Sequence, residues 1–260
     1  MVGALKTAAS GMEAQLSQID HISNNIANVN TTGYKRSRAE FQDLLYETTQ
    51  EPGANTSALT QSPLGIQRGM GVRVAGTQRN FEMGAPTHTQ RDLDMLIRGE
   101  GFFVVQLPNG QAAYRRDGTF HKAPSGRVET VEGYPLLPEV TIPPNAKTIQ
   151  VSEEGAIHAV ISEMEKVQIG QVQLATFVNN GGLKAMGKNL YLETAGSGAA
   201  NLSSPGDGVT GHVMQHFLES SNVEVMREMT DMIAAQRAYE MNSKVIQTVD
   251  QMLQHTVNVR

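Results

Sequence analysis

The sequence predicts an α+β protein in which long helices at the two ends of the chain bracket a central antiparallel β domain. All ten prolines lie between Pro52 and Pro205, and no glycine follows Gly211, so strong helix breakers gather in the middle of the 260 residues. Each end also carries apolar residues at heptad spacing, which is typical of helices that pack along a seam. The middle instead alternates short runs of β-forming residues with turn residues.

The first segment, residues 1–33, is predicted to form an N-terminal core helix. Its apolar residues recur mainly every seventh position, with others between them that broaden the stripe: Leu5, Met12, Leu16, Ile19, Ile22, Ile26 and Val29. Asn24, Asn25 and Asn28 lie beside this stripe. Gly33 fits a left-handed residue that ends the helix, and Tyr34 can fold back onto the last turn.

The last segment, residues 221–260, is predicted to form a longer helix over about 222–255 that packs with the first one. Ser221 and Glu224 have the spacing of a capping box, in which a serine hydroxyl and a glutamate carboxylate satisfy free amides at a helix start. The apolar stripe repeats every seventh residue and is widened by a few neighbours: Val225, Met229, Met232, Ile233, Tyr239, Ile246, Val249 and Leu253. Each stripe is too narrow to form a core alone, so we expect the pair to need further copies.

Between the helices we expect an extended connector over residues 34–80 and an antiparallel β domain over residues 81–220. The connector is rich in proline and glycine, and a stretch of this kind is better suited to spanning domains or subunits than to a compact core. Asn109-Gly110 separates two β-forming runs and predicts a hairpin. The basic cluster Tyr34–Arg38 is interpreted as a solvated helix exit.

Composition excludes several classes of function. The net charge of −5 and the scattered basic residues argue against nucleic-acid binding. The chain has no cysteine, so disulfides and thiolate sites are excluded. We expect no membrane insertion, because no apolar stretch has the length of a span, and no cleaved signal peptide.

Three patterns imitate chemical sites, and we predict no catalytic, cofactor or metal site from any of them. Residues 206–211 fit a dinucleotide fingerprint, but they follow a polar loop instead of a strand. His212 and His216 have the spacing of a helical metal pair within a segment that is predicted to be a strand. Carboxylates that could serve a hydrolase of the cell wall are the remaining pattern: Asp92, Asp94, Glu100 and Asp117.

Several segments together resemble one protein family, the rod and hook proteins of the bacterial flagellum. The opening motif is NNIANVNTTGYKR at residues 24–36, and the closing motif is QRAYEMNSKVIQTVDQML at residues 236–253. Three further stretches occur in the same order as in the family: RGEGFFVV, YRRDGTF and ESSNVEV. The length and the connector at residues 41–74 resemble those of the distal rod members most closely; a proximal rod or hook-type subunit is the alternative.

The resemblance implies a structural subunit that self-assembles into a rigid helical tube, the distal rod crossing the periplasm in the flagellar basal body. Such a tube transmits torque from motor to hook and encloses the export channel. Its implied partners are other copies, proximal rod proteins below, the hook protein above, the surrounding peptidoglycan and outer-membrane ring proteins, and the flagellar type III export apparatus. We interpret the asparagines beside the first stripe as neutral contacts between copies, because an amide can donate and accept without charge.

Overall fold

The computed structural model describes residues 2–53, 55–57, 60–61, 63–162 and 165–258, which fall into two compact units. We call Met1–Ala27, Ser37–Gln78 and Glu224–Arg260 the helical unit, and Asn28–Arg36 with Arg79–Val223 the β unit. The α+β class predicted from the sequence is confirmed, with one long helix at each end and an antiparallel β region between them.

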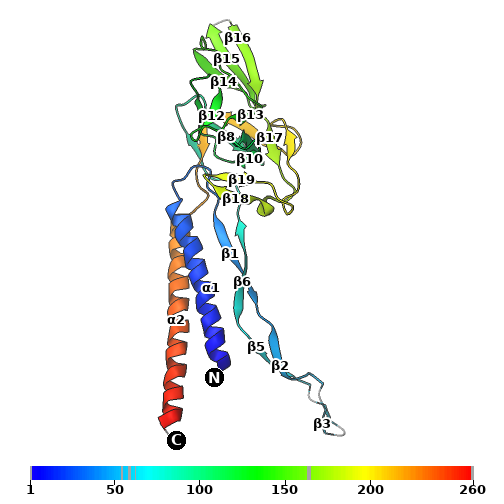
Figure 1. Ribbon diagram of the computed structural model, residues 1–260, viewed down its shortest axis with the longest axis vertical. Coiled ribbons are helices and arrows are strands. Elements are labelled where there is room, and N and C mark those ends of the chain that lie inside the picture. Colours follow the sequence, from blue (N-terminus) through cyan, green and yellow to red (C-terminus); the bar gives the residue numbers. More distant parts are fainter. Residues whose placement is uncertain (1, 54, 58–59, 62, 163–164, 259–260) are drawn as a thin grey trace. The chain divides into compact units, whose positions relative to one another are not determined.

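The helical unit is built on two antiparallel helices, α1 (Val2–Ala27) and α2 (Val225–Asn258) (Figure 1). The Asn25 side chain donates to Glu228 over 3.1 Å, and a Cβ added to Gly11 would lie 3.0 Å from Nδ2 of Asn242. These two contacts are two heptads apart on both helices. The two helices therefore lie against each other over this length.

The first helix ends earlier, and the last helix begins later, than the sequence predicts. The helix α1 ends at Ala27, and the residues from Asn28 to Gly33 form turns. Gly33 has the predicted left-handed backbone, with φ of +67°, but it lies in a turn, and its own backbone amide donates to the carbonyl of Glu219 over 2.7 Å. It is therefore not the helix cap.

The predicted capping box is also absent at the start of α2. The helix begins at Val225, and the carbonyl of Glu224 accepts the first helical hydrogen bond from Glu228 at 3.0 Å. The Ser221 hydroxyl accepts from the amide of Val223 at 3.3 Å, which lies before the helix. The physical reason is that Asn222 is held in the β unit by hydrogen bonds, so the chain turns helical only after it.

The connector is a ribbon of paired strands within the helical unit. The pairs are β1 (Ser37–Asp43) with β6 (Val72–Arg79), β2 (Tyr46–Gln50) with β5 (Ile66–Gly69), and β3 (Asn55–Ser57) with β4 (Thr60–Gln61). Residues 54, 58–59 and 62 of this segment lie outside the described residues.

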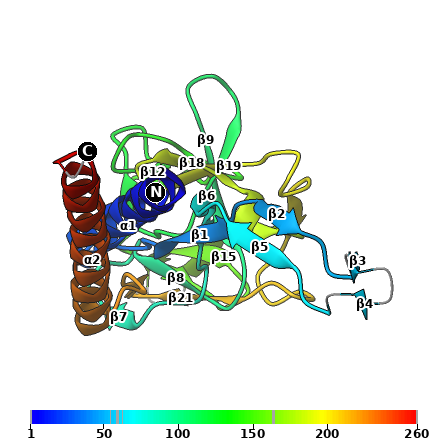
Figure 2. The same ribbon diagram turned by 90° about the horizontal axis from the view of Figure 1, so that it is seen from below.

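The ribbon lies along α1 within this unit. The amide of Val72 donates to the Ser10 hydroxyl over 3.3 Å, and Thr77 contacts His21 over 3.3 Å. Figure 2 shows α1 between α2 and the paired strands β1 and β6.

The described residues of the β unit form a seven-stranded antiparallel sheet, a three-stranded sheet and three strand pairs. The large sheet has the order β18 (Lys184–Gly187), β19 (Leu190–Leu192), β10 (Ala112–Arg115), β9 (Phe102–Gln106), β17 (Leu174–Thr176) and β20 (Asn201–Ser203), with β13 (Leu136–Leu137) beside β9. The small sheet is β14 (Thr148–Val151), β15 (Ala156–Ser162) and β16 (Glu165–Gln171). The pairs are β11 (Phe120–Lys122) with β12 (Val128–Thr130), β8 (Met95–Arg98) with β21 (His212–Gln215), and β7 (Pro86–His88) with β22 (Phe217–Glu219).

Strand β9 divides two apolar cores, because alternate side chains point to opposite faces of a sheet. Phe103 and Val105 belong to the larger core, whereas Phe102 and Val104 belong to a smaller, aromatic one. The predicted hairpin joins β9 to β10, with Gly110 at φ of +81°. The amide of Leu107 donates to the carbonyl of Gln111, so the loop has three residues rather than the two that its Asn-Gly pair suggests.

Candidate functional site

The predicted helix residues divide into inner and outer positions within the helical unit. On α1, Ile22 and Asn25 are buried, and Leu16 is 48% exposed. On α2, Val225, Met229 and Ile233 are exposed. The remaining apolar members of both stripes are half-buried: Leu5, Met12, Ile19, Ile26, Met232, Tyr239, Ile246, Val249 and Leu253. The pairing of the two helices therefore covers only part of their apolar surface.

The asparagines of the opening motif have different environments. Asn24 is exposed on α1, whereas Asn28 and Val29 are half-buried and belong to the β unit because the helix ends before them. Asn25 is 1% exposed and is held inside its own chain. For Asn25, the interpretation as a contact between copies is wrong.

Asn25 ties three elements of the helical unit together. Its amide nitrogen donates to the carbonyl of Ser37 over 2.8 Å and to the carboxylate of Glu228 over 3.1 Å. Its amide oxygen accepts from the amide of Ser37 over 3.0 Å. One uncharged side chain thus links α1 to the first residue of β1 and to the first turn of α2.

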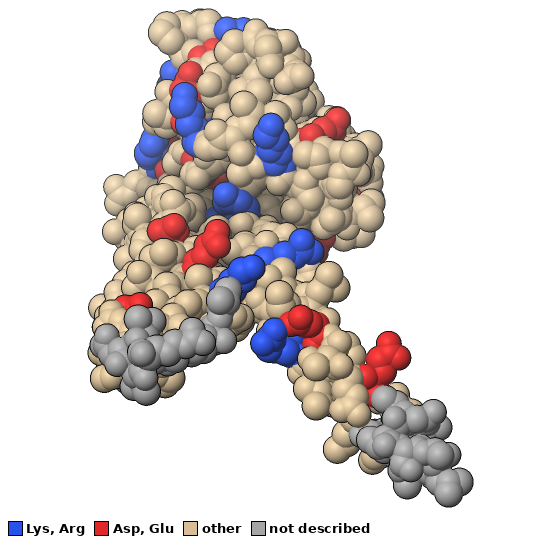
Figure 3. Space-filling view, turned by 60° about the horizontal axis from the view of Figure 1, so that its bottom comes forward, with Lys and Arg blue, Asp and Glu red and all other residues tan. Residues whose placement is uncertain are grey.

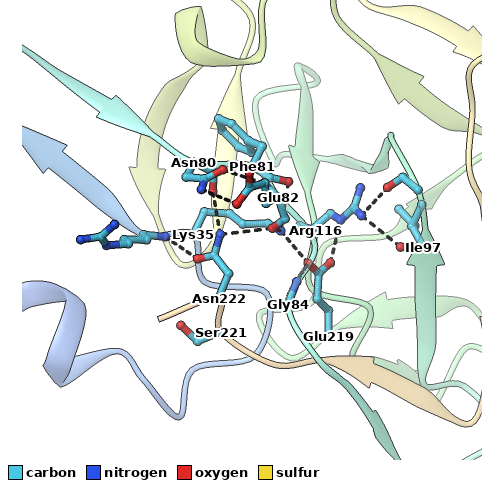
Figure 4. A network of polar contacts seen from close by, with 12 residues as sticks. Lys35, Asn80, Phe81, Glu82, Gly84, Ile97, Arg116, Glu219, Ser221 and Asn222 are labelled. Atoms are coloured by element: carbon cyan, nitrogen blue, oxygen red, sulfur yellow. Dashed lines mark hydrogen bonds and ion pairs between the residues drawn. The ribbon is translucent and has the colours of Figure 1, made fainter. Parts of the chain in front are cut away.

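The β unit holds a buried charged junction, drawn in Figure 4, where residues from both ends of the chain meet. Lys35 donates to the Glu219 carboxylate over 2.5 Å, and Arg116 donates to the other oxygen of the same carboxylate over 2.7 Å. None of the three side chains is more than 4% exposed. The amide of Gly84 donates to Glu219 as well, over 2.9 Å.

Two buried cations share one carboxylate at this junction, and backbone carbonyls accept their remaining hydrogen bonds. Lys35 donates to the carbonyl of Glu82 over 2.6 Å. The Arg116 guanidinium donates to the carbonyls of Ile97, Gly99 and Gly101. The pKa of Lys35 is lowered from its usual value, and burial of the ammonium group is the largest cause. The facing Glu219 carboxylate opposes this shift. The junction is therefore a fully paired structural network.

Asn222 bridges the same two chain ends beside the junction. Its amide oxygen accepts from the backbone amide of Arg36 over 2.7 Å, and its amide nitrogen donates to the carbonyls of Asn80 and Glu82. Together with Lys35, it joins the segment leaving the first helix to the segment entering the last one. The interpretation of Tyr34–Arg38 as a solvated exit is wrong for Lys35, which is 0% exposed, and for Tyr34, which is 8% exposed.

Two of the four carboxylates that could suggest a hydrolase, Asp94 and Asp117, have structural partners. Asp117 accepts from Arg115 and from the amide and hydroxyl of Thr119, and Asp94 is 1% exposed beside Arg91. Among the described residues, no group of His, Asp and Glu has an arrangement that could hold a metal ion. His212 lies in β21 and His216 follows it with a left-handed φ of +64°, so the two do not share a helix face.

The surface and the helices add two general findings. In Figure 3, Lys, Arg, Asp and Glu side chains are scattered among uncharged residues on the face that is drawn. Among the described residues, no helix combines the length and the apolar character needed to cross a membrane.

Comparisons with known proteins match three family models along the chain. Residues 5–35 match the flagella basal body rod protein model, residues 96–159 the D1 domain of the flagellar hook proteins FlgE/F/G, and residues 214–259 the C-terminal region of the flagellar basal body rod proteins FlgEFG.

Curated relatives match over nearly the whole length. The flagellar basal-body rod protein FlgG of Caulobacter vibrioides is 49% identical, with 99% of both chains covered. FlgG of Borreliella burgdorferi is 46% identical over 97% of both chains, and FlgG of Bacillus subtilis is 37% identical over 100% of both.

The fold and the matches define a structural axial protein of the bacterial flagellum, not an enzyme, as predicted. The chain belongs to the FlgG family of flagellar basal-body rod proteins, whose members are subunits of the distal rod in the basal body. The resemblance that the terminal motifs indicate is thereby confirmed.

Proposed function

We propose that copies of this chain assemble through the outer faces of the helix pair into a helical tube. In this tube the terminal helices form a coiled-coil-like inner core, and the β units form the outer wall. The observation that carries the proposal is the apolar surface left on α2 after α1 has packed against it. Met226, Met229, Ile233 and Met241 remain 71%, 49%, 51% and 61% exposed.

This exposure supports assembly because an elongated helix with large apolar side chains on two sides is unfavourable in water. Burial of a large apolar side chain contributes about 1.5–3 kcal/mol. Several such residues on each copy, repeated along a polymer, would provide the driving force for helix packing between copies. The exposed Asn24, the half-buried Asn28 and the remaining stripe residues would complete these contacts.

The connector is proposed as a second contact between neighbouring copies. Leu45, Tyr46 and Ile66 on the ribbon are 88%, 56% and 57% exposed. Strand pairing gives the ribbon a defined shape, so it can interlock with a neighbour and stiffen the tube. Residues 1–33, 34–80, 81–220 and 221–260 would then act as inner helix, interlocking connector, outer wall and second inner helix.

In the flagellum, such a tube would transmit torque from the motor to the hook and enclose the channel for exported subunits. Its axial neighbours would be proximal rod proteins on one side and the hook protein on the other. The peptidoglycan and outer-membrane rings would surround it, and the type III export apparatus would deliver its subunits.

The test introduces one charge on the exposed face of α2. Ile233→Asp should abolish polymers seen by sedimentation and electron microscopy, because a carboxylate would have to be buried between copies. The melting temperature of the monomer should change little, because Ile233 is half exposed in the single chain.

Ile233→Leu is the matched control, because it keeps an apolar side chain at the same half-exposed position of α2, and it should assemble normally. Normal polymers from Ile233→Asp would contradict the proposed packing face.

A further inference from the structure

The outer face of α2 is unusually rich in methionine. Five of the 13 methionines of the chain lie within the 34 residues of this helix. Four of them are among the most exposed apolar side chains of the described residues: Met226 at 71%, Met229 at 49%, Met241 at 61% and Met252 at 57%. A helix that only needed apolar contacts could use leucine, which has a similar volume and helix propensity.

A thioether adds a chemical property that leucine lacks, namely oxidation by peroxide. Hydrogen peroxide transfers one oxygen atom to the methionine sulfur. The O–O bond breaks, an S=O bond forms, the sulfur loses two electrons and the peroxide leaves as water. The product is polar and chiral, which disrupts apolar interfaces, and methionine sulfoxide reductases can reverse the change.

We propose that the exposed methionines of α2 form an oxidation site that regulates assembly: sulfoxides on Met226, Met229, Met241 and Met252 block the packing of α2 against other copies. This inference rests on the proposed function, because it requires this face to be buried between copies. It applies to the subunit before assembly, since burial in the tube would remove the same sulfur atoms from contact with peroxide.

The environments of other methionines provide internal comparisons. Met95 is 0% exposed in the core of the β unit and should resist peroxide in the folded chain. Met83 and Met186 are 41% and 55% exposed in the β unit, so they should oxidise without entering the helix interface. Peroxide damage that acts through the β unit can therefore be separated from damage on α2.

The experiment treats purified full-length monomer with hydrogen peroxide and maps each sulfoxide by mass spectrometry of peptides. Sedimentation then gives the critical concentration for assembly. We expect this concentration to rise about tenfold or more, equivalent to about 1.4 kcal/mol. Methionine sulfoxide reductases of both stereochemical specificities should restore it. Preformed polymers should show at least about tenfold slower oxidation at the four sites, which corresponds to about 1.4 kcal/mol in the activation free energy.

The variant M226L/M229L/M241L/M252L should assemble and should keep its critical concentration after peroxide treatment, although Met83 and Met186 still oxidise. Equal loss of assembly in this variant, or an unchanged critical concentration in oxidised wild type, would overturn the inference while the proposed function stands. If the variant does not assemble even before treatment, reductase recovery of the wild type decides the question. Failure of untreated wild type to assemble would instead refute the proposed function and the inference with it.

Discussion

Replacing Glu219 by glutamine should destabilise the β unit strongly without changing the shape of the side chain. Glu219 carries the only carboxylate that contacts both Lys35 and Arg116 among the described residues of the junction. The Glu219→Gln variant would leave two buried cations, the Lys35 ammonium and the Arg116 guanidinium, with uncharged groups as their partners. One amide oxygen can replace an acceptor, but it cannot neutralise charge.

The magnitude follows from the burial of all three groups. Removing one partner of a buried ion pair costs about 3–5 kcal/mol, because the other charge remains uncompensated. Lys35 can lose its proton, since burial already lowers its pKa, and this limits the cost. Arg116 cannot do so. We therefore expect a loss of about 3 kcal/mol, or about 6–12 °C in melting temperature for a unit of this size.

Calorimetry and urea unfolding of the full chain measure this loss. The matched control is Glu139→Gln, because Glu139 is also paired with an arginine, but over 3.9 Å and with 49% of its side chain exposed. That change should cost less than about 0.5 kcal/mol. A Glu219→Gln variant that melts within about 2 °C of the wild type would refute the reasoning, since 2 °C corresponds to less than about 1 kcal/mol. Lys35→Met combined with Glu219→Gln should recover part of the loss.

Three further predictions concern single residues. Gly33→Ala should lower the free energy of unfolding by about 1–3 kcal/mol more than Gly133→Ala does, as measured by urea unfolding. Both glycines have positive φ, but only at Gly33 would the added Cβ lie 2.7 Å from the amide nitrogen of Asp117, so equal losses in the two variants would contradict this reason. Asn25→Ala should lower the free energy of unfolding by about 2–4 kcal/mol, because it removes the buried hydrogen bonds to Ser37 and Glu228. Ser23→Ala, on the exposed side of α1, should cost less than about 0.5 kcal/mol, and similar losses in the two variants would argue against Asn25 as a link between α1, β1 and α2. Burial raises the pKa of Tyr114 to about 12, so between about pH 10 and 12 the unfolded chain releases a proton that the native chain keeps. Stability should therefore fall as pH rises through this range, and Tyr114→Phe should flatten the slope; an unchanged slope in this variant would count against burial of Tyr114 as the cause.

The secondary structure of the ends and the hairpin could be predicted because their signals are local. Heptad spacing, the lack of proline and the Asn109-Gly110 pair act over a few residues, and the structure confirms both helices and the β9–β10 hairpin. The residues at which the helices begin and end could not be predicted as well from the sequence. Residues from Asn28 to Gly33 have helical spacing, but the amide of Gly33 is held by the carbonyl of Glu219, a residue far along the chain.

The charged junction could not be predicted for the same reason. Lys35 lies in a basic cluster that resembles an ordinary solvated turn, and Glu219 precedes a serine-rich segment. Their separation in sequence is 184 residues. A buried ion pair has no sequence period, so only the approach of the two chain ends in the folded β unit reveals it.

The sequence by itself determined the class of this protein: two heptad-bearing ends around a β-rich middle, with terminal motifs of a flagellar rod protein and no set of residues for catalysis. Tertiary structure decided which polar residues are used inside the chain, as with Asn25 between Ser37 and Glu228 and Lys35 beside Glu219. The physical reason is the range of each effect. Periodicity and turn preference depend on neighbours in sequence, whereas burial and pairing of polar groups depend on neighbours in space, which the chain acquires only when it folds.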